Sequence, residues 1–389
     1  MRITAFEKCC GCACCADTCP QKCISMHYDE HGFYCPEVDN TFCINCNKCV
    51  SVCPQNKTFE RNEVQEVYKG FAKEIGSDSN QKSTSGAIFP ILAEEIISNG
   101  GVAVGAAFDQ NFDKVFHIVC EDMSQVERCR GSKYIQSETQ GIFSEVRSFL
   151  VKGIPVLFTG TPCQVAALKS FLKKEWDILY TVDFVCHGVG STKFFKQCVD
   201  YLSGGVKASH IGFRDKCGNY RNSQFRIIDI KGRLISSIDF GKAHFVKAFA
   251  NNLISRKSCG TCLYATTKRI SDLTLADNIL FNTDLEKALG SSLIFVNTKK
   301  GKDLFNLGKD KMSFEELHKE KVLPMVMHLN HPALAHRDRN KILDAMSRQG
   351  YAKAAKYISD YIPKETLIKR TTHLLKRVVR RISRGHCFK

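Results

Sequence analysis

Two cysteine runs with the same spacing lie within the first 54 residues and constrain the fold more than any other feature. They read Cys9-x-x-Cys12-x-x-Cys15-x-x-x-Cys19-Pro20 and Cys43-x-x-Cys46-x-x-Cys49-x-x-x-Cys53-Pro54. Three cysteines spaced in this way follow a loop around three corners of a cubic iron–sulfur cluster, and the Cys-Pro turn sends the fourth to the other cluster. The spacing therefore predicts two 4Fe-4S clusters, with the ligand sets Cys9, Cys12, Cys15 and Cys53, and Cys43, Cys46, Cys49 and Cys19.

Zinc and disulfides are the alternatives for so many cysteines. Zinc ribbons use pairs of Cys-x-x-Cys, not triplets followed by Cys-Pro. The start, Met1–Lys8, lacks the apolar segment of a secretory signal, and no run reaches the roughly 18 apolar residues of a membrane helix. Twenty-one cysteines without an export signal indicate metal ligands in a cytoplasmic protein. Cys10, Cys14, Cys23 and Cys35 lie outside the ligand positions and are expected to be packing residues.

Strands and helices alternate along the central part of the chain. Val102–Phe108 and Ile178–Val185 are predicted strands, and Ile142–Val151 is a predicted helix. Such alternation is typical of an α/β domain with a largely parallel sheet, here joined to an α+β ferredoxin module. We expect four segments. The two-cluster module covers residues 1–57, the N-terminal part of the α/β unit 66–175, and its C-terminal part 176–330. A basic helical tail covers 331–389.

The tail carries most of the net charge of +16, with 15 Lys and Arg against 4 Asp and Glu in residues 331–389. Leu367, Leu374 and Val378 fall on one helical face there, and basic residues crowd the others. A basic amphipathic helix over 364–389 is typical of a segment that contacts an anionic membrane surface, here the inner face of the membrane. A solvated tail and a partner-binding helix remain open alternatives. Nucleic acid is not expected, because aromatic stacking residues and a binding module are missing.

A second group of chemical residues begins where a predicted strand ends in Gly160-Thr161-Pro162-Cys163-Gln164. Thr161, Pro162 and Gln164 fit the cap, first and third positions of a helix. This places Cys163 in the first turn, where the helix dipole favours the thiolate, and makes the turn around Thr161 a candidate anion pocket.

Three further cysteines follow Cys163. The next strand ends in Cys186-His187-Gly188, and Cys259-x-x-Cys262 comes later in a loop. Cys163, Cys186, Cys259 and Cys262 are enough to ligate a third cluster, although buried structural cysteines are an equal alternative. His187 is either a proton donor at the sheet edge or a structural histidine.

Two loops have the composition of anion-binding turns. Ser83-Thr84-Ser85-Gly86 precedes a helix, and Arg130-Gly131-Ser132-Lys133-Tyr134 combines two cations, a glycine and an aromatic ring. No G-x-G-x-x-G follows a strand, so a conventional dinucleotide-binding fold is not expected.

Taken together, these segments resemble the coenzyme F(420) hydrogenase/dehydrogenase beta-subunit family, in the version with an N-terminal two-cluster ferredoxin domain. The matching words are SerThrSerGly at 83–86, GlySerLysTyr at 131–134, GlyThrProCysGln at 160–164, CysHisGly at 186–188, PheArgAspLys at 213–216 and SerCysGlyThrCys at 258–262. The chain departs from the family pattern at Ala87, at Gly190 and at Ala276-Asp277-Asn278-Ile279, where a Gly and a Trp are absent.

The resemblance implies a flavoprotein that binds FAD and moves electrons between iron–sulfur clusters, the flavin and an organic acceptor. Ser83, Ser85, Gly86, Gly131, Ser132, Lys133, Tyr134 and Thr161 would then form the FAD site, with Lys133 on a phosphate and Tyr134 against a ring. His187 would supply a proton. The expected acceptor is a small organic molecule, for which the deazaflavin coenzyme and an intermediate of a polysaccharide pathway are candidates. The expected partner is an electron donor or acceptor protein such as ferredoxin. A non-catalytic electron-transfer subunit that feeds a partner enzyme is the alternative.

Overall fold

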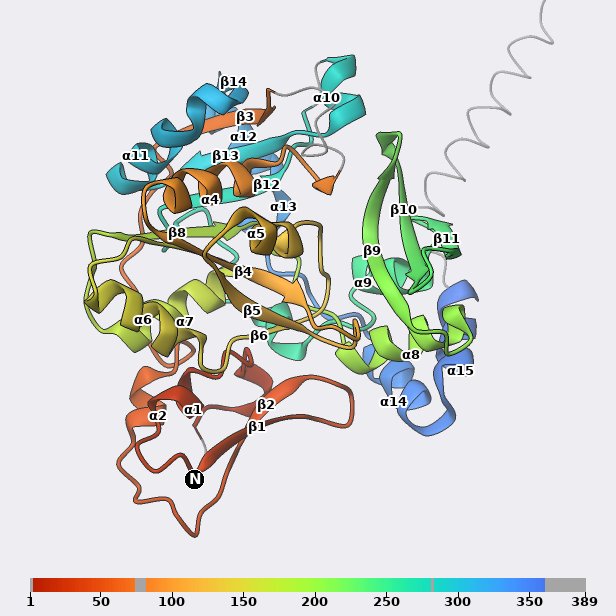
Figure 1. Ribbon diagram of the computed structural model, residues 1–389. Coiled ribbons are helices and arrows are strands. Elements are labelled where there is room, and N and C mark those ends of the chain that lie inside the picture. Colours follow the sequence, from red (N-terminus) through yellow and green to blue (C-terminus); the bar gives the residue numbers. More distant parts are fainter. Residues whose placement is uncertain (1–2, 74–81, 281–282, 361–389) are drawn as a thin grey trace, which may run out of the picture.

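The computed structural model describes residues 3–73, 82–280 and 283–360 (Figure 1). The helix expected over 364–389 therefore lies outside the described residues. Within the described ranges, no helix is long and apolar enough to cross a membrane.

The N-terminal module is built from two short helices and a β-hairpin. The third cysteine of each triplet lies in a short helix, Cys15 in Cys14–Thr18 (α1) and Cys49 in Lys48–Val52 (α2). Both helices begin after a residue in the left-handed region, Ala13 and Asn47, each with φ 57°. Strands Ile24–Tyr28 (β1) and Tyr34–Val38 (β2) form the antiparallel hairpin, and Phe6–Lys8 is a short 3-10 helix (η1). The module lies at one end of the molecule (Figure 1).

A nine-stranded sheet forms the centre, in the order β14-β3-β13-β12-β8-β7-β4-β5-β6. The strands are Glu66–Ala72 (β3), Val102–Phe108 (β4), Val115–Cys120 (β5), Ser137–Glu138 (β6), Val156–Gly160 (β7), Leu179–Phe184 (β8), Leu273–Asp277 (β12), Ser292–Val296 (β13) and Met312–Leu317 (β14). The predicted α/β fold class is confirmed, but the sheet is mixed. The run β12-β8-β7-β4 is parallel, whereas β5 pairs antiparallel with β4, as do β13 with β12, β3 with β13 and β14 with β3.

The connections explain the mixture. Only a few residues join β4 to β5, and a short turn can return the chain only antiparallel, whereas parallel neighbours need a crossover such as the helix between β7 and β8. Strands from both predicted α/β parts, 66–175 and 176–330, share this one sheet. The four-segment division itself stays a prediction.

Helices cover both faces of the sheet (Figure 1). Ile142–Val151 (α6) and Pro162–Leu172 (α7) pack with the cysteine module in one core, and Ile88–Ser98 (α4), Met123–Cys129 (α5) and Lys299–Gly308 (α11) build the other. Further short helices lie between and after the last strands of the sheet: Asp284–Leu289 (α10), Lys309–Lys311 (η3), Lys319–Val322 (α12), Leu323–Met325 (η4) and Met327–Asn330 (α13).

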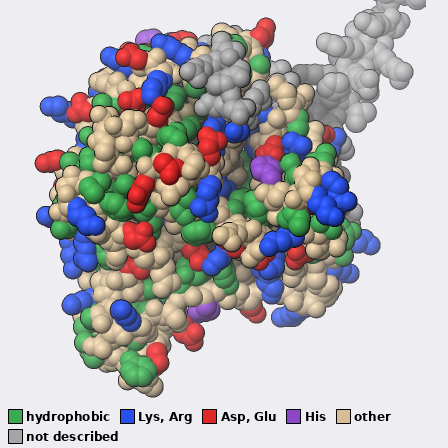
Figure 2. All heavy atoms as spheres, in the orientation of Figure 1, with side chains coloured by type: hydrophobic (Ala, Val, Ile, Leu, Met, Phe, Trp, Pro, Cys, Tyr) green, Lys and Arg blue, Asp and Glu red, His purple; other side chains and the backbone are tan. Residues whose placement is uncertain are grey.

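A second lobe stands beside the sheet (Figure 1). Its antiparallel sheet has the order β11-β10-β9, from Ala208–Cys217 (β9), Asn219–Asp229 (β10) and Leu234–Asp239 (β11). Buried phenylalanines, among them Phe194, Phe213 and Phe245, join this sheet to helices Thr192–Ser203 (α8), His244–Ala250 (α9), Arg339–Gln349 (α14) and Tyr351–Asp360 (α15). Acidic, basic and apolar side chains are interspersed on the face in Figure 2.

Candidate functional site

The first thiol cage is a hollow lined by Cys9, Cys12, Cys15 and Cys53, together with Cys10. The turn that wraps it depends on Gly11, which has φ +66° and no room for a side chain. A Cβ there would lie 2.4 Å from both the Tyr34 carbonyl oxygen and the Gln136 Nε2. Glycine is therefore required for the backbone conformation and for the close approach of the main body.

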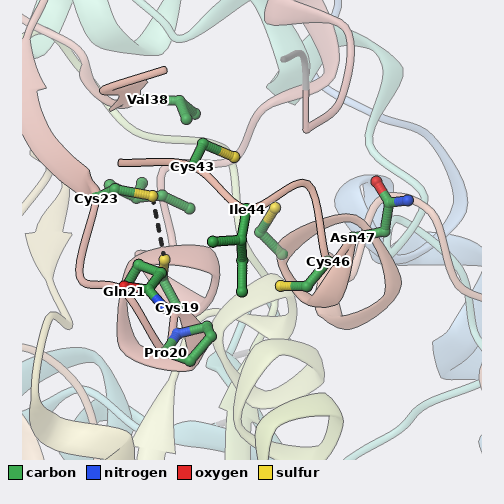
Figure 3. A pocket seen from close by; sticks show the side chains of 11 residues that line it. Cys19, Pro20, Gln21, Cys23, Val38, Cys43, Ile44, Cys46 and Asn47 are labelled. Carbon is green, nitrogen blue, oxygen red and sulfur yellow. Dashed lines mark hydrogen bonds between the residues drawn. The ribbon is translucent and has the colours of Figure 1, made fainter. Parts of the chain in front are cut away.

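The second thiol cage is a hollow lined by Cys19, Cys43, Cys46 and Cys49, together with Cys23 (Figure 3). Cys19 belongs to the first run, and Cys53 of the second run lies in the first cage. The fourth cysteine of each run thus lies with the other run's triplet, which is the geometry that the spacing predicts, although ligation itself stays a prediction. Cys46 is exposed, so the second cage is the one nearest to solvent.

The chemistry of the donors in both cages fits an iron–sulfur cluster. Soft thiolates select such clusters, and each hollow presents four or more thiols. Over the described ranges, no three His, Cys, Asp or Glu side chains converge tightly enough for a single ion. Burial raises the pKa of Cys53 to about 12, so that without a metal its thiol keeps the proton. Cluster binding would have to release that proton.

A third thiol group lies at one edge of the central sheet. β7 and β8 are parallel, so Cys163 at the start of α7 and Cys186 just after β8 leave the sheet at the same edge. The loop with Lys257–Thr261 (η2) brings Cys259 and Cys262 to this edge. Burial and the neighbouring Cys259 and Cys262 raise the pKa of Cys186, and Cys262 also acts on Cys163. The structure thus brings the four cysteines together.

The expected thiolate at Cys163 is not supported. The helix cap does form as predicted: the Thr161 N–H donates to Gln164 Oε1 at 2.9 Å, and Pro162 is the first helical residue. However, the neighbouring Cys10 thiol and the loss of hydration raise the pKa of Cys163 well above its usual value. Desolvation of the thiolate outweighs the helix dipole here.

Buried polar contacts dock the cysteine module onto the sheet edge. Arg256, 6% exposed, donates to the carbonyl oxygens of Cys9 at 2.9 Å and Tyr34 at 2.5 Å, and to Gln136 Oε1 at 2.7 Å. Ser258 Oγ donates to the same Cys9 oxygen at 2.9 Å. The loop that carries Cys259 is therefore bonded directly to the backbone of the first cage.

His187 uses both of its ring nitrogens in hydrogen bonds. Its Nε2 lies 3.2 Å from the carbonyl oxygen of Phe249, and its Nδ1 lies 2.7 Å from Nε2 of His328. A carbonyl only accepts, so Nε2 of His187 carries the proton and Nδ1 accepts from His328. Burial and the charge of His328 lower the pKa of His187 to about 4. The side chain is therefore neutral and engaged, as in a structural histidine.

The two predicted anion loops meet. Arg130 donates through Nε and Nη2 to Ser83 Oγ, at 3.2 and 3.0 Å, and the Ser132 N–H donates to Thr84 Oγ1 at 2.8 Å. Ser85 Oγ bonds to the carboxylate of Asp277. Serine and threonine hydroxyls, a guanidinium and backbone N–H groups thus gather at one place.

Four predicted cofactor residues have other partners. Lys133 Nζ donates to the carbonyl oxygens of Cys129, Arg130 and Gly131, at 3.2, 2.9 and 3.2 Å. Gly86 packs against the backbone of Gly70 in β3, Thr161 caps α7, and Gly131 supplies a turn at φ +79°. Their assignment to FAD stays a prediction. In the structure, the Lys133 side chain stabilises its own loop.

Arg214, Lys216, Tyr220 and Asp277 join the anion loops, and the sequence patterns did not identify them as site residues. Arg214 Nη1 lies 2.5 Å from the Asp277 carboxylate, and its guanidinium bonds to the Tyr220 hydroxyl. The buried Nε of Arg214 has no hydrogen-bond partner among the residues that the structure describes. Lys216 Nζ donates to the Ser85 carbonyl oxygen at 3.2 Å. The family-like motif PheArgAspLys at 213–216 was the one sequence signal for Arg214 and Lys216.

The cationic side chains of Arg130, Arg214 and Lys216 favour an anionic ligand at this site. Burial and the neighbouring cations Arg214 and Arg130 lower the pKa of Lys216 to about 8. Two carboxylates already bond to these cations, Asp277 to Arg214 and Glu127 to Arg130. Three cations, an orphaned guanidinium N–H and the rings of Tyr134 and Tyr220 fit a flat ligand with phosphate groups, such as FAD.

A backbone ladder connects this anion site to the third thiol group. The Gly190 N–H donates to the Tyr134 carbonyl oxygen at 2.9 Å, and Gly190 also bridges Ser255. The loop with Tyr134, the Cys-His-Gly loop and the loop with Cys259 therefore lie side by side.

Comparison with known families places two parts of the chain. Residues 155–321 match the model of the C-terminal part of the coenzyme F420 hydrogenase/dehydrogenase beta subunit, and residues 36–56 match that of the 4Fe-4S binding domain. No curated protein matches the chain. One similar solved chain belongs to the F420-reducing [NiFe] hydrogenase complex from Methanosarcina barkeri, a xenon derivative. It has 17% identity and a TM-score of 0.47, over 76% of this chain and 92% of that chain. The predicted family resemblance and the 4Fe-4S domain are confirmed in the matched ranges.

Proposed function

We propose that this chain, whose residues 155–321 match the C-terminal part of the beta subunit of coenzyme F420 hydrogenase/dehydrogenase, is an iron–sulfur flavoprotein oxidoreductase. It would take up electrons at its 4Fe-4S module and reduce an organic acceptor at the anion site. The observation that carries the proposal is that the loops with Tyr134, with Cys186 and with Cys259 lie side by side. The anion site, the third thiol group and the docked module are joined by hydrogen bonds through Tyr134, Gly190 and Arg256.

The residues of the anion site would hold FAD. Arg130, Ser83 and Ser132 are suited to a phosphate group, and the rings of Tyr134 and Tyr220 offer apolar surface to a flat ring system. A bound flavin supplies the conversion between one-electron carriers and two-electron reductions, which iron–sulfur clusters lack. The acceptor would be the deazaflavin coenzyme or a polysaccharide intermediate, and ferredoxin would be a donor at the solvent-exposed second cage.

One observation favours the second candidate, an electron-transfer subunit without its own substrate. His187, the predicted proton donor, has both ring nitrogens in hydrogen bonds and a pKa of about 4. A neutral, fully bonded imidazole is a poor general acid near pH 7. Proton delivery would then depend on another group or on a partner protein.

Anaerobic purification with iron, FAD and turnover assays separates the two candidates. The oxidoreductase predicts stoichiometric FAD and reduction of small acceptors by the isolated chain. The electron-transfer subunit predicts iron without such turnover until a partner is added. A preparation with full iron and no flavin would refute the flavoenzyme.

Removing a cysteine of the third group tests for a third cluster. At four irons per cluster, the wild-type chain should contain about twelve irons, and Cys259→Ser about eight. Cys198→Ser is the control, because that buried thiol bonds to Tyr351 in the second lobe, away from the cages. If iron is unchanged in Cys259→Ser, the third group is structural.

Binding of FAD should weaken as the pH rises through about 8. Lys216 is cationic below its pKa of about 8 and neutral above it, so its attraction for a phosphate is present at pH 7 and lost at pH 9. Titrations of the flavin-depleted protein from pH 6.5 to 9.5 measure this. Lys216→Gln should bind FAD more weakly at pH 7 and lose the pH dependence. The same slope in that variant would assign the titration to another group.

A further inference from the structure

Two cysteines that belong to neither thiol cage nor to the third thiol group lie in contact beside the anion site. Cys120 is the last residue of β5 and Cys129 is the last residue of α5, and their sulfur atoms are 3.7 Å apart. Cys129 directly precedes Arg130, the first residue of the loop that ends at Tyr134. The thiol pair therefore lies where the chain enters this loop of the anion site.

A glycine in the neighbouring strand leaves the space for this contact. Helix α5 packs against β4 and β5 (Figure 1). Gly105 pairs with Ile118 and Ala103 pairs with Cys120 across these two strands, so Gly105 and Cys120 belong to the same face of the sheet. A Cβ at Gly105 would lie 3.0 Å from both Cβ and Sγ of Cys129, closer than ordinary van der Waals contact. The absent side chain thus allows Cys129 to lie over β4 and reach Cys120.

The two thiols differ in exposure and in acidity. Cys120 is 0% exposed, whereas Cys129 is half-buried. The hydrogen bond with Cys120 and the charges of Lys133 and Arg128 lower the pKa of Cys129, and the same hydrogen bond together with burial raises the pKa of Cys120. A partly exposed thiol near cations is the usual setting of a reactive cysteine. Cys129 is thus the thiol that a reagent from solvent reaches, and Cys120 is its buried partner.

The backbone of Cys129 is bonded to the anion loop. Lys133 Nζ donates to the Cys129 carbonyl oxygen at 3.2 Å, and the next residue, Arg130, donates to Ser83 Oγ at 3.0 Å. A disulfide needs a sulfur–sulfur distance of about 2.05 Å, so the two sulfur atoms would approach by about 1.7 Å. Because Cys120 is fixed in a packed core, Cys129 would make most of this movement and displace the loop that follows it.

We propose that Cys120 and Cys129 form a thiol–disulfide redox site that reacts with small disulfides such as oxidised glutathione, and that its oxidation weakens ligand binding at the adjacent anion site. The effect on the ligand rests on the proposed FAD site, whereas the redox site itself does not.

The exchange proceeds in two steps. The Cys129 sulfur first attacks one sulfur of the small disulfide, so that a mixed disulfide forms, the original sulfur–sulfur bond breaks and one thiolate leaves. The Cys120 sulfur then attacks Sγ of Cys129, the mixed disulfide breaks and the second thiolate leaves. The two cysteines are oxidised by two electrons, the small disulfide is reduced to two thiols, and the two cysteine protons pass to those thiols.

Incubation of the full chain, with its clusters loaded anaerobically, in mixtures of reduced and oxidised glutathione tests this site. The oxidised fraction is raised up to the point just before iron is released. Peptide mapping by mass spectrometry after alkylation should then find a cross-link between Cys120 and Cys129. FAD should bind severalfold more weakly to the oxidised chain, amide hydrogen exchange in residues 129–134 should become faster, and dithiothreitol should reverse all three changes.

Substitutions of either cysteine should abolish the response. Cys129→Ser and Cys120→Ala should bind FAD as the reduced wild type does and should not respond to oxidised glutathione. Two variants are used because Cys120 lies in the core, where a substitution can destabilise the fold, whereas Cys129 is half-buried. Cys198→Ser is the matched control, because it removes a thiol that bonds to Tyr351 in the second lobe. This control should keep both the cross-link and the weaker binding.

Four outcomes would count against the inference or limit it to one readout. Free thiols at Cys120 and Cys129 in the most oxidising buffer that preserves the iron would overturn the redox site. A cross-link that changes neither FAD affinity nor hydrogen exchange would overturn the regulation. Equal weakening of FAD binding in Cys129→Ser would assign the effect to other cysteines and overturn it too. If the reduced chain binds no FAD, the proposed function fails, and hydrogen exchange in 129–134 with and without the cross-link still decides the inference.

Discussion

Arg256→Ala is expected to lower the free energy of unfolding by about 3 kcal/mol or more and to loosen the cysteine module from the sheet edge. The guanidinium is buried and donates to three acceptors, the carbonyl oxygens of Cys9 and Tyr34 and the side-chain oxygen of Gln136. Its removal leaves these acceptors buried without a donor, at about 1–3 kcal/mol for each that water does not reach.

Denaturant unfolding under anaerobic conditions measures this loss, and limited proteolysis reports detachment of the module. Arg256→Lys should be intermediate, because an ammonium group cannot reproduce the planar fork that reaches three acceptors. Lys242→Ala is the control: this exposed lysine pairs with exposed Asp239, and such pairs often contribute nothing measurable. Wild-type stability and protease resistance in Arg256→Ala would show that the clamp does not hold the module.

Asp183→Asn is expected to lower the free energy of unfolding by about 3–5 kcal/mol, the usual effect of removing one partner of a buried ion pair. Asp183 lies 2.8 Å from the guanidinium of Arg269, and the side chains are 0% and 2% exposed. Asp183 also accepts from Thr274 Oγ1 at 2.6 Å. Asparagine keeps the shape but leaves the charge of Arg269 without its counterion.

The same variant should lose iron from the third group. Arg269 Nη1 donates to the carbonyl oxygens of Tyr264 and Thr266, both at 3.1 Å, in the segment that follows Cys262. When Arg269 moves, this segment loses its anchor. Thermal unfolding and iron analysis measure the two effects, with Asp284→Asn, whose carboxylate is 97% exposed, as the control. Full stability with full iron in Asp183→Asn would contradict both expectations.

Local patterns were reliable where the chemistry depends on near neighbours. The repeat of Cys-x-x-Cys-x-x-Cys predicted a duplicated module, and the two triplets do enter equivalent helices, α1 and α2. Thr161, Pro162 and Gln164 predicted the start of α7 for the same reason, because capping involves residues within one turn. The predicted strand Val102–Phe108 and the predicted helix Ile142–Val151 coincide with β4 and α6.

Residues whose role depends on distant partners could not be assigned in this way. Arg214 and Asp277 are 63 residues apart and meet only because the second lobe lies beside the central sheet. The sequence also did not indicate that the Lys133 side chain bonds to three carbonyl oxygens of its own loop, and its assignment to a phosphate group stays a prediction. Cys163 looked like a thiolate, but burial beside Cys10 outweighs the helix dipole.

By itself, the sequence determined that this protein has a two-run cysteine module, an α/β body and the family resemblance of its loops, since spacing and periodicity are properties of neighbouring residues. Only the tertiary structure decided that the module docks through Arg256 and that four distant cysteines share one sheet edge. These contacts join segments up to about 250 residues apart, and burial sets their strength. Neither the contact between distant segments nor its burial can be predicted from spacing and periodicity in the sequence.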